Sequence, residues 1–325
     1  MELFTRVKTP ESSIQIDYTK KIAFFGSCFA DNISAQFALR KFKVFANPFG
    51  TVYNPLSIEL QLQHIAGRKV FGEGDFFKDE RCDGLWHCWD AHSSLSAPTS
   101  EECLEKLNAA CAQAREFLQQ ADIVFITVGS AFVYSLKDDE NGYSKVVANC
   151  HRQDQRMFER RLISADEAAQ AIKRIVENIR ILRPNAHIVF TVSPIRHIGD
   201  GAHGNNLSKA TVLLGIEKTL QEIAPSAEYF PSYEIMMDEL RDYRFYDRDM
   251  IHLSKTAEEI IFERMLETYC DGTTRENIAK VEKFLKMASH RIQDENSPAT
   301  QEFKKKLIAQ ANELEKHIPG LILNE

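Results

Sequence analysis

The sequence lacks long hydrophobic runs, an excess of basic residues and any apolar segment near its start. No uninterrupted apolar run approaches the roughly 20 residues that cross a bilayer, and the first residues, MELFTRVKTPESS, do not resemble a signal peptide. Lys and Arg number 40 against 47 Asp and Glu, which gives a net charge of -7. Binding to phosphate backbones requires clustered Lys and Arg. We therefore expect no nucleic-acid partner, no membrane partner and a cytoplasmic location.

The cysteines follow no recognisable spacing. There are seven, none forms a Cys-x-x-Cys pair, and their count is odd. Neither a zinc ribbon nor a disulfide framework is indicated, which agrees with a reducing compartment. His87, His92 and His151 could be metal ligands, but carboxylates at ligand spacing are not evident near them. We expect no metal and no cofactor, and interpret these histidines as residues that line or support a pocket.

Composition and patterning predict an α/β fold. Of the 325 residues, 44% are hydrophobic and 27% are charged, which is typical of a soluble globular protein. Strand-like and helix-like stretches alternate, which predicts a parallel sheet covered by helices on both faces. We expect this domain at residues 1–272 and a helical extension at residues 273–325. The expected strands are residues 22–25, 43–46, 122–128, 187–192 and 228–233, with a hairpin around Asn141-Gly142.

The most informative stretch is Lys20 to Asn32, KKIAFFGSCFADN. A short apolar run is followed by Gly26-Ser27 and then by a helical pattern, so Ser27 is expected at the carboxyl end of a strand. Open α/β sheets bind their ligands at that edge, and the start of a helix favours negative charge. Ser27 is therefore a candidate nucleophile and Cys28 a rival, while a simple helix-capping serine is the structural alternative.

A serine nucleophile needs a base, and the base needs an orienting acceptor. Asp249 and His252 supply both in Asp-Met-Ile-His, on a predicted loop before the last helix of the sheet domain. The three-residue spacing lets the carboxylate reach one ring nitrogen while the other faces the serine. An exposed carboxylate beside a loop histidine is the structural alternative.

The order of these motifs resembles that of the SGNH (GDSL-like) hydrolases, with a nucleophile near the N-terminus and Asp-x-x-His near the C-terminus. Gly26 to Ala30, GSCFA, resembles the signature of the GSCFA family, a branch of that superfamily. The resemblance covers roughly residues 20–270. Further segments that carry it are residues 47–55, Trp86-His87, residues 127–130, 149–151, 191–194 and 230–234, and Asp249 to His252.

The resemblance implies a three-layer α/β/α sandwich of the flavodoxin-like, SGNH hydrolase type with a parallel, mainly five-stranded sheet. It implies Ser27 as nucleophile, His252 as base and Asp249 as the orienting carboxylate. The oxyanion would be stabilised by the backbone N–H groups of Ser27 and Gly50.

The sequence departs from the superfamily pattern after the third strand. A Gly-x-Asn-Asp motif commonly supplies an oxyanion-binding Asn there, but this chain has Gly129-Ser130-Ala131-Phe132. Asn149, or alternatively His151, could replace that donor. The apolar run at residues 146–148 is expected to add a strand beside the third one and to bring the Asn149 amide to the same edge.

Several other residues are expected to bind substrate. Trp86 and His87 lie on an unpatterned segment whose aromatic groups suit a pocket wall. Arg196 follows the fourth strand and could bind an anionic group or only solvate a loop. The full set of expected substrate-binding residues is Trp86, His87, Gly129, Ser130, His151 and Arg196.

Together these features predict an acyl-ester hydrolase or acyltransferase that acts through a Ser27 acyl-enzyme. By analogy with the superfamily, the expected partner is a small-molecule or carbohydrate ester, such as an acetylated sugar. The alternative is a non-catalytic domain that binds a ligand and retains the fold.

Overall fold

The computed structural model describes residues 5–137, 145–223, 226–290 and 297–323, and the hairpin expected around Asn141-Gly142 lies outside them. The main sheet has five strands in the order β10-β9-β5-β1-β2, and all its pairings are parallel. The predicted parallel five-stranded sheet is therefore confirmed. Its strands are β1 (Lys21–Gly26), β2 (Lys43–Ala46), β5 (Ile123–Val128), β9 (His187–Val192) and β10 (Ala227–Tyr229).

Strand β5 forms the centre of the sheet, between β1 and β9. All six of its residues are buried, as its β-branched and aromatic composition requires for a strand covered on both faces. Phe125 of β5 stacks on Phe24 of β1 with ring centroids 5.0 Å apart. β10 ends earlier than the predicted strand, because Pro231 cannot donate a ladder hydrogen bond and the helix α6 (Ser232–Glu234) begins there.

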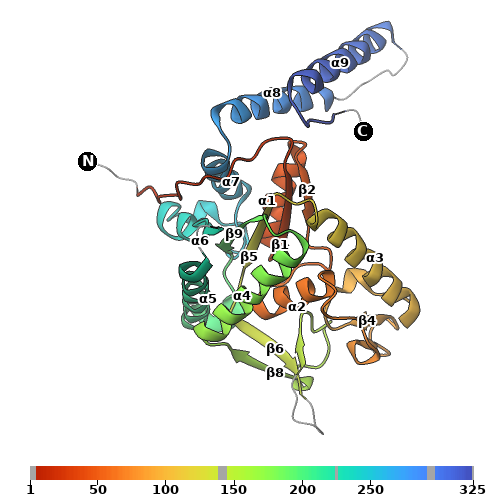
Figure 1. Ribbon diagram of the computed structural model, residues 1–325, viewed down its shortest axis with the longest axis vertical. Helices are drawn as coiled ribbons and strands as arrows, with labels where there is room; N and C mark the ends of the chain where they lie inside the picture. The colour runs from red at the N-terminus through yellow and green to blue at the C-terminus, as the bar shows by residue number, and fades with distance from the viewer. Residues whose placement is uncertain (1–4, 138–144, 224–225, 291–296, 324–325) are drawn as a thin grey trace.

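Helices cover both faces of the sheet, as Figure 1 shows. The apolar residues of α1 and α7 pack in one core cluster, and those of α2, α3, α4 and α5 pack in the other. The bounds are α1 (Cys28–Leu39), α2 (Pro55–Ile65), α3 (Ser100–Leu118), α4 (Ala165–Leu182), α5 (Gly201–Ile223) and α7 (Lys255–Tyr269).

Polar caps set where several of these helices begin. The Asn54 side chain accepts a hydrogen bond from the Ser57 N–H, Ser164 accepts one from Glu167, and Ser254 accepts one from Ala257. Each bond satisfies an N–H that the first turn leaves without a helical partner. The Ser254 cap matters for the site, because it fixes the start of α7 directly after the Asp249–His252 segment.

Two smaller sheets lie beside the main one. A hairpin joins β3 (Phe76–Lys78) to β4 (Trp86–Cys88), and β6 (Phe132–Leu136) pairs with β7 (Lys145–Val147) and β8 (Phe158–Leu162). The expectation that the run before Asn149 adds a strand beside the third strand of the main sheet is wrong. Both edges of β5 are already occupied by β1 and β9, so β7 pairs antiparallel with its sequence neighbour β6 instead.

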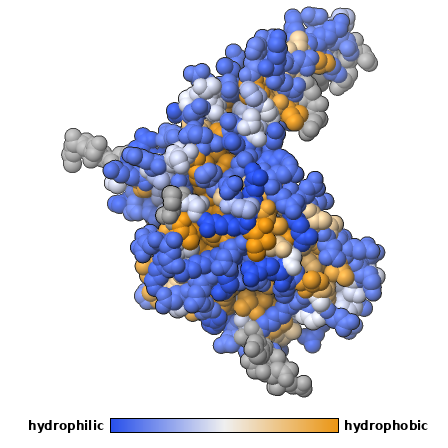
Figure 2. Space-filling model, viewed as in Figure 1, coloured by the Kyte–Doolittle hydropathy of each residue, from blue (hydrophilic) through white to orange (hydrophobic). Residues whose placement is uncertain are grey.

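The C-terminal helices α8 (Gly272–Ala288) and α9 (Pro298–His317) project from the end of the molecule opposite β6 and β8 (Figure 1). Ile278 and Val281 of α8 are buried in the same apolar cluster as Ile14 and Phe262. The face shown in Figure 2 is mainly hydrophilic, with smaller groups of apolar residues between the hydrophilic ones. Within the described ranges, the structure contains no helix with the length and apolar character of a membrane span.

Candidate active site

Ser27 lies at the carboxyl end of β1 and at the N-cap position of α1, but its side chain makes no capping hydrogen bond. It is only 1% exposed, and Ser27 Oγ has no hydrogen-bond partner within the described part of the chain. Buried polar atoms are normally satisfied, so an unpartnered hydroxyl at this edge of the sheet is notable. The Ser27 side chain thus does not act as a helix cap.

The preceding residue has to be glycine. Gly26 has φ +127°, and a Cβ built there would lie 2.0 Å from the backbone oxygen of Thr127. No other residue tolerates both the conformation and the close approach of β5. Gly26 therefore sets the turn that brings Ser27 to the end of the central strands.

Asp249 and His252 form the contact expected of a base and its orienting carboxylate. Asp249 Oδ2 lies 2.6 Å from His252 Nδ1, while Asp249 Oδ1 accepts hydrogen bonds from the N–H groups of Ile251 and His252. These bonds, the one from the His252 ring first, lower the pKa of Asp249 to about 2. The carboxylate stays ionised at neutral pH and fixes a proton on Nδ1, which leaves Nε2 to accept one.

His252 lines a cavity of about 620 Å³ at the carboxyl edge of the sheet. The cavity wall also includes Cys28, Thr51, Ser130, Asn149 and Arg196. Ser27 itself is buried and is not one of the wall residues, and no hydrogen bond joins Ser27 Oγ to His252 in this structure. The structure thus brings His252 and the residue next to Ser27 to one cavity, and the hydrogen bond expected between serine and histidine is not formed.

Cys28 lines the cavity, but its thiol is poorly suited to be the nucleophile. Burial, and after it the nearby Asp31 carboxylate, raises the pKa of Cys28. The thiolate is the reactive form, so these surroundings work against it. Ser27 remains the stronger candidate.

The two backbone donors expected in the oxyanion hole are both engaged. The Gly50 N–H donates to the Asn47 carbonyl oxygen at 2.8 Å, and the Ser27 N–H makes a long bond of 3.3 Å to the Thr127 oxygen. The next residue, Thr51, lines the cavity, and its N–H has no acceptor among the described residues. Thr51 is therefore a donor that the sequence did not indicate, because a free N–H depends on how the loop turns.

Asn149 lines the same cavity, as the proposed substitute for the missing asparagine must. Its Oδ1 accepts a hydrogen bond from the His151 N–H at 2.7 Å. This bond holds the amide in one orientation and leaves the Nδ2 protons to donate. Asn149 is thus oriented by its own loop rather than by a strand of the main sheet.

Trp86, His87 and His151, which the sequence suggested as substrate-binding residues, are not among the residues that line this cavity. Trp86 and His87 belong to the β3–β4 hairpin, and His87 donates to or accepts from Ser96 Oγ at 2.6 Å. His151 is buried, with Nδ1 2.9 Å from Ser93 Oγ and Nε2 2.8 Å from the Cys88 oxygen. Burial lowers the pKa of His151 to about 4, so the ring is neutral and connects segments of the scaffold. Aromatic character alone did not distinguish a pocket wall from a supporting core.

Gly129 and Ser130 form a rigid turn at the end of β5. Their N–H groups both donate to the Tyr53 oxygen, at 2.7 and 2.8 Å, so neither is available to an oxyanion. Lys209 Nζ donates to the carbonyl oxygens of Gly129 and Ser193, at 2.7 and 2.6 Å. Ser130 therefore remains a wall residue of the cavity, whereas Gly129 is bound into the turn.

Lys209 is a residue that the sequence did not single out. It is 1% exposed, and burial lowers its pKa to about 7. In the sequence, Lys209 is a charged residue on a predicted amphipathic helix, and charged residues of such helices normally face solvent. Only the packing of α5 against the ends of β5 and β9 gives it an interior role.

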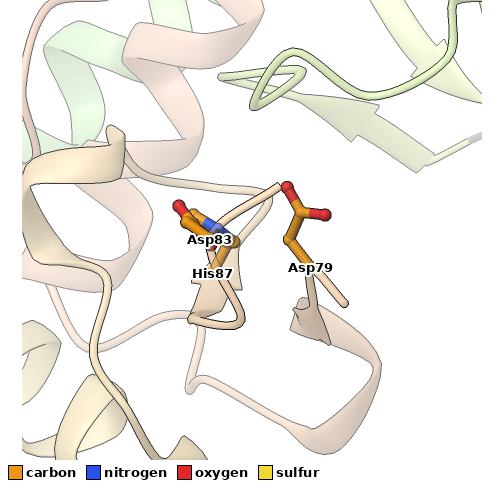
Figure 3. A group of neighbouring side chains, drawn as sticks. All are labelled: Asp79, Asp83 and His87. Atoms are coloured by element: carbon orange, nitrogen blue, oxygen red, sulfur yellow. Dashed lines mark hydrogen bonds and ion pairs between the residues drawn. The ribbon is translucent and has the colours of Figure 1, made fainter. Parts of the chain in front are cut away.

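Figure 3 shows Asp79, Asp83 and His87. One potential metal-ligand atom of each side chain lies within 4.8 Å of those of the other two. The same atoms make hydrogen bonds within the hairpin. Asp79 Oδ1 accepts from the Arg81 and Cys82 N–H groups, and Asp83 Oδ1 lies 3.2 Å from His87 Nε2. These bonds explain the cluster as a means of closing the loop between β3 and β4.

The fold and the site together define a class: a three-layer α/β/α protein with a serine at the end of its first strand and an Asp–His pair before its last core helix. The GSCFA family model matches residues 21–265, and the chain belongs to the GSCFA family. The comparison with curated proteins gave no match.

Three solved structures share weak similarity with the chain. A family two carbohydrate esterase from Clostridium thermocellum, in complex with cellohexaose, has 12% identity and a TM-score of 0.36 over 84% of this chain and 66% of its own. A carbohydrate esterase family 3 protein from Talaromyces cellulolyticus has 8% identity and a TM-score of 0.32 over 81% and 99%. The acetyl xylan esterase Est2A from Butyrivibrio proteoclasticus has 11% identity and a TM-score of 0.35 over 78% and 64%. The chain thus spans just under two thirds of the length of the first and third of these proteins.

Proposed function

We propose that this protein is a serine esterase, or an acyltransferase, that transfers a small acyl group through a Ser27 acyl-enzyme. The observation that carries the proposal is the Asp249–His252 contact at a cavity that Cys28 also lines, directly after Ser27, whose buried hydroxyl has no partner among the described residues. The substrate class implied by the family resemblance is an acetylated carbohydrate or a related metabolite.

In the proposed reaction His252 Nε2 takes the proton from Ser27 Oγ as this oxygen attacks the ester carbonyl carbon. The tetrahedral intermediate collapses, and the departing alcohol takes the proton from the imidazolium. Water, or an acceptor alcohol, then attacks the acyl-enzyme with His252 acting as base again, and Ser27 recovers its proton. Asp249 keeps its charge throughout and stabilises the imidazolium.

This reaction needs His252 to approach Ser27. The Asp249–His252 segment lies on the surface, where both side chains are about half exposed (46% and 50%). Apo sites often hold their catalytic groups at longer distances than the substrate complex does. We propose that substrate binding brings the ring over Ser27, with Asn149 Nδ2, the Thr51 N–H and the weakly bonded Ser27 N–H facing the oxyanion.

The test is hydrolysis of p-nitrophenyl acetate by the purified protein. Ser27→Ala should abolish turnover, because it removes the proposed nucleophile, whereas Cys28→Ala should retain it. Ser34→Ala on the same helix is the matched control, since Ser34 Oγ only donates to the Asp31 oxygen. Labelling by a serine-reactive organophosphate, located by peptide mass spectrometry, should occur at Ser27 and disappear in Ser27→Ala.

A non-catalytic binding domain is the second candidate, and one observation favours it: Ser27 and His252 make no hydrogen bond here. That function predicts no turnover and no organophosphate labelling. Turnover that survives in Ser27→Ala would contradict the serine mechanism, and loss of turnover in Cys28→Ala alone would favour the thiol.

A further inference from the structure

A second cleft, of about 490 Å³, adjoins the candidate active site and shares Arg196, His197 and Ile198 with it. Asn205 and Asn206 at the start of α5 contribute to its wall. Tyr243, Tyr246 and Met250 contribute from the segment that leads to His252. The cleft is therefore next to the reacting groups and is partly built from the chain that carries the proposed base.

Two side chains of this cleft, Arg196 and Asn205, carry hydrogen-bond donors that could serve a ligand. Arg196 Nη1 donates to Asn206 Oδ1 at 2.9 Å, and no carboxylate in the described ranges pairs with Arg196. Asn205 is 2% exposed, and its Oδ1 accepts a hydrogen bond from the His197 N–H at 2.9 Å. Its Nδ2 is buried with no acceptor among the described residues. A buried amide donor without a partner costs stability unless a ligand or water supplies the acceptor.

Among the described residues, the cleft wall contains no Asp or Glu. Four carboxylates adjoin wall residues in the sequence. Asp200 pairs with Arg160, Asp242 with Arg244 and Asp249 with His252, whereas Asp247 accepts a hydrogen bond from the Arg248 N–H. Asp242 and Asp200 line neighbouring cavities with Arg196, but no carboxylate among the described residues forms an ion pair with its guanidinium. The planar fork of its remaining N–H groups suits a carboxylate or a phosphate.

We propose that this cleft binds an anionic oxyacid group, a carboxylate or a phosphate, on the alcohol half of the ester, with Arg196 and Asn205 Nδ2 as donors. The proposal rests on the proposed esterase function, since it places the ester bond in the adjoining cavity. Tyr243 and Tyr246 are the aromatic surfaces on which a sugar ring can pack. The preferred substrate is thus an acetylated acidic sugar rather than a neutral one.

Binding can be measured without turnover, by calorimetry on the full chain with three deacetylated sugars: methyl glucuronide, methyl glucoside 6-phosphate and neutral methyl glucoside. At least one anionic sugar should bind roughly tenfold or more tightly than the neutral one, as a charged hydrogen-bonded pair implies. If the glucuronide has the highest affinity of the three sugars, the site binds carboxylates. If the sugar phosphate has the highest affinity, the site binds phosphates. Equal affinity for all three, or no binding of any, overturns the proposal.

Two variants and one control locate the effect. Arg196→Gln should remove the preference for the anionic sugar, and Asn205→Asp should do the same by placing an acceptor where the donor was while keeping Oδ1 for the His197 N–H. Arg244→Gln removes a nearby positive charge outside the cleft and should keep the preference. Retained preference in both Arg196→Gln and Asn205→Asp overturns the subsite.

The proposed function and the subsite fail in distinguishable ways. Hydrolysis of p-nitrophenyl acetate that depends on Ser27, without any preference for anionic sugars, keeps the esterase and removes the subsite. Binding of an anionic sugar that depends on Arg196, without any turnover, keeps the subsite and removes the esterase.

Discussion

At the scale of single residues, Asn149 is the side chain that we propose contributes most to the oxyanion hole. Its oxygen is held by the His151 N–H, and it lines the same cavity as His252. The Nδ2 group is therefore the part of the amide that can donate to a developing negative charge. Such a donor differs from the backbone N–H groups because it can be removed by substitution.

We predict that Asn149→Ala lowers the acylation rate by about a hundredfold, because one donor of an oxyanion hole contributes on that order. The measurement is the pre-steady-state burst of p-nitrophenyl acetate hydrolysis. Asn149→Asp is the matched variant: it keeps the acceptor for the His151 N–H but loses the donor. If Asn149→Asp behaves like the wild type while Asn149→Ala does not, the amide supports only the loop.

Gly26 provides a second prediction at this scale. In Gly26→Ala the new Cβ would meet the Thr127 oxygen at 2.0 Å in a backbone conformation with φ +127°. We expect a loss of more than about 2 kcal/mol in the free energy of unfolding, since a strained φ and a steric clash add. The measurement is urea denaturation. Gly74→Ala is the control, because a Cβ there meets nothing within 4 Å, and an equal loss in both variants would contradict the argument.

At the scale of elements, α5 connects the ends of β5 and β9 through Lys209. The ammonium group donates to one carbonyl oxygen from the turn after each strand, Gly129 and Ser193, and no carboxylate pairs with it in the described part of the chain. Burial lowers the pKa of Lys209 to about 7 in the folded protein, whereas the pKa of a lysine in an unfolded chain is about 10.4. Between these two values the unfolded chain binds a proton that the native chain does not.

The free energy of unfolding should therefore rise with pH between about 7 and 10, because stability increases wherever the unfolded state binds more protons. Below about pH 7 Lys209 is protonated in both states and contributes no slope. Denaturation of Lys209→Met across this range should show a smaller rise than the wild type. Lys218→Met, an exposed lysine on the same helix, should keep the wild-type slope, and equal slopes for wild type and Lys209→Met would contradict the assignment.

At the scale of the whole molecule, α8 and α9 lie away from the candidate site. Neither the candidate active-site cavity nor the adjoining cleft takes a wall residue from the described part of residues 273–325. Ile278 and Val281 nevertheless extend the apolar cluster formed by α1 and α7. We propose that residues 1–272 form the catalytic domain and residues 273–325 an extension that stabilises it.

Deletion of residues 273–325 should leave kcat on p-nitrophenyl acetate unchanged within about twofold at a temperature where the shortened chain is folded. The melting temperature should fall by several degrees, since each buried aliphatic side chain contributes about 1.5–3 kcal/mol. In the full chain, Ile278→Ala should lower the melting temperature, and Ile308→Ala, at a residue 58% exposed, should not. Loss of activity in a folded deletion variant would contradict the division.

The sequence by itself determined the features that depend on neighbouring residues. Buried strands appear as apolar runs, and five of them in alternation with helices predicted the parallel sheet that the structure confirms. The Asp249–His252 contact joins residues three apart, so their spacing alone predicted it. The GSCFA motif is likewise contiguous, so the resemblance to the family is legible in the amino-acid sequence alone.

Only the tertiary structure decided the features that depend on distant segments. Because both edges of β5 are occupied, the strand before Asn149 pairs with β6 in another sheet. The turn at residues 47–50 places the Gly50 N–H in a hydrogen bond to the Asn47 oxygen. Burial turns His151 into a supporting residue and Lys209 into an interior one, although both are polar in the sequence. Hydrogen-bond partners and desolvation are properties of three-dimensional surroundings, and segments more than 50 residues apart in the chain supply those surroundings here.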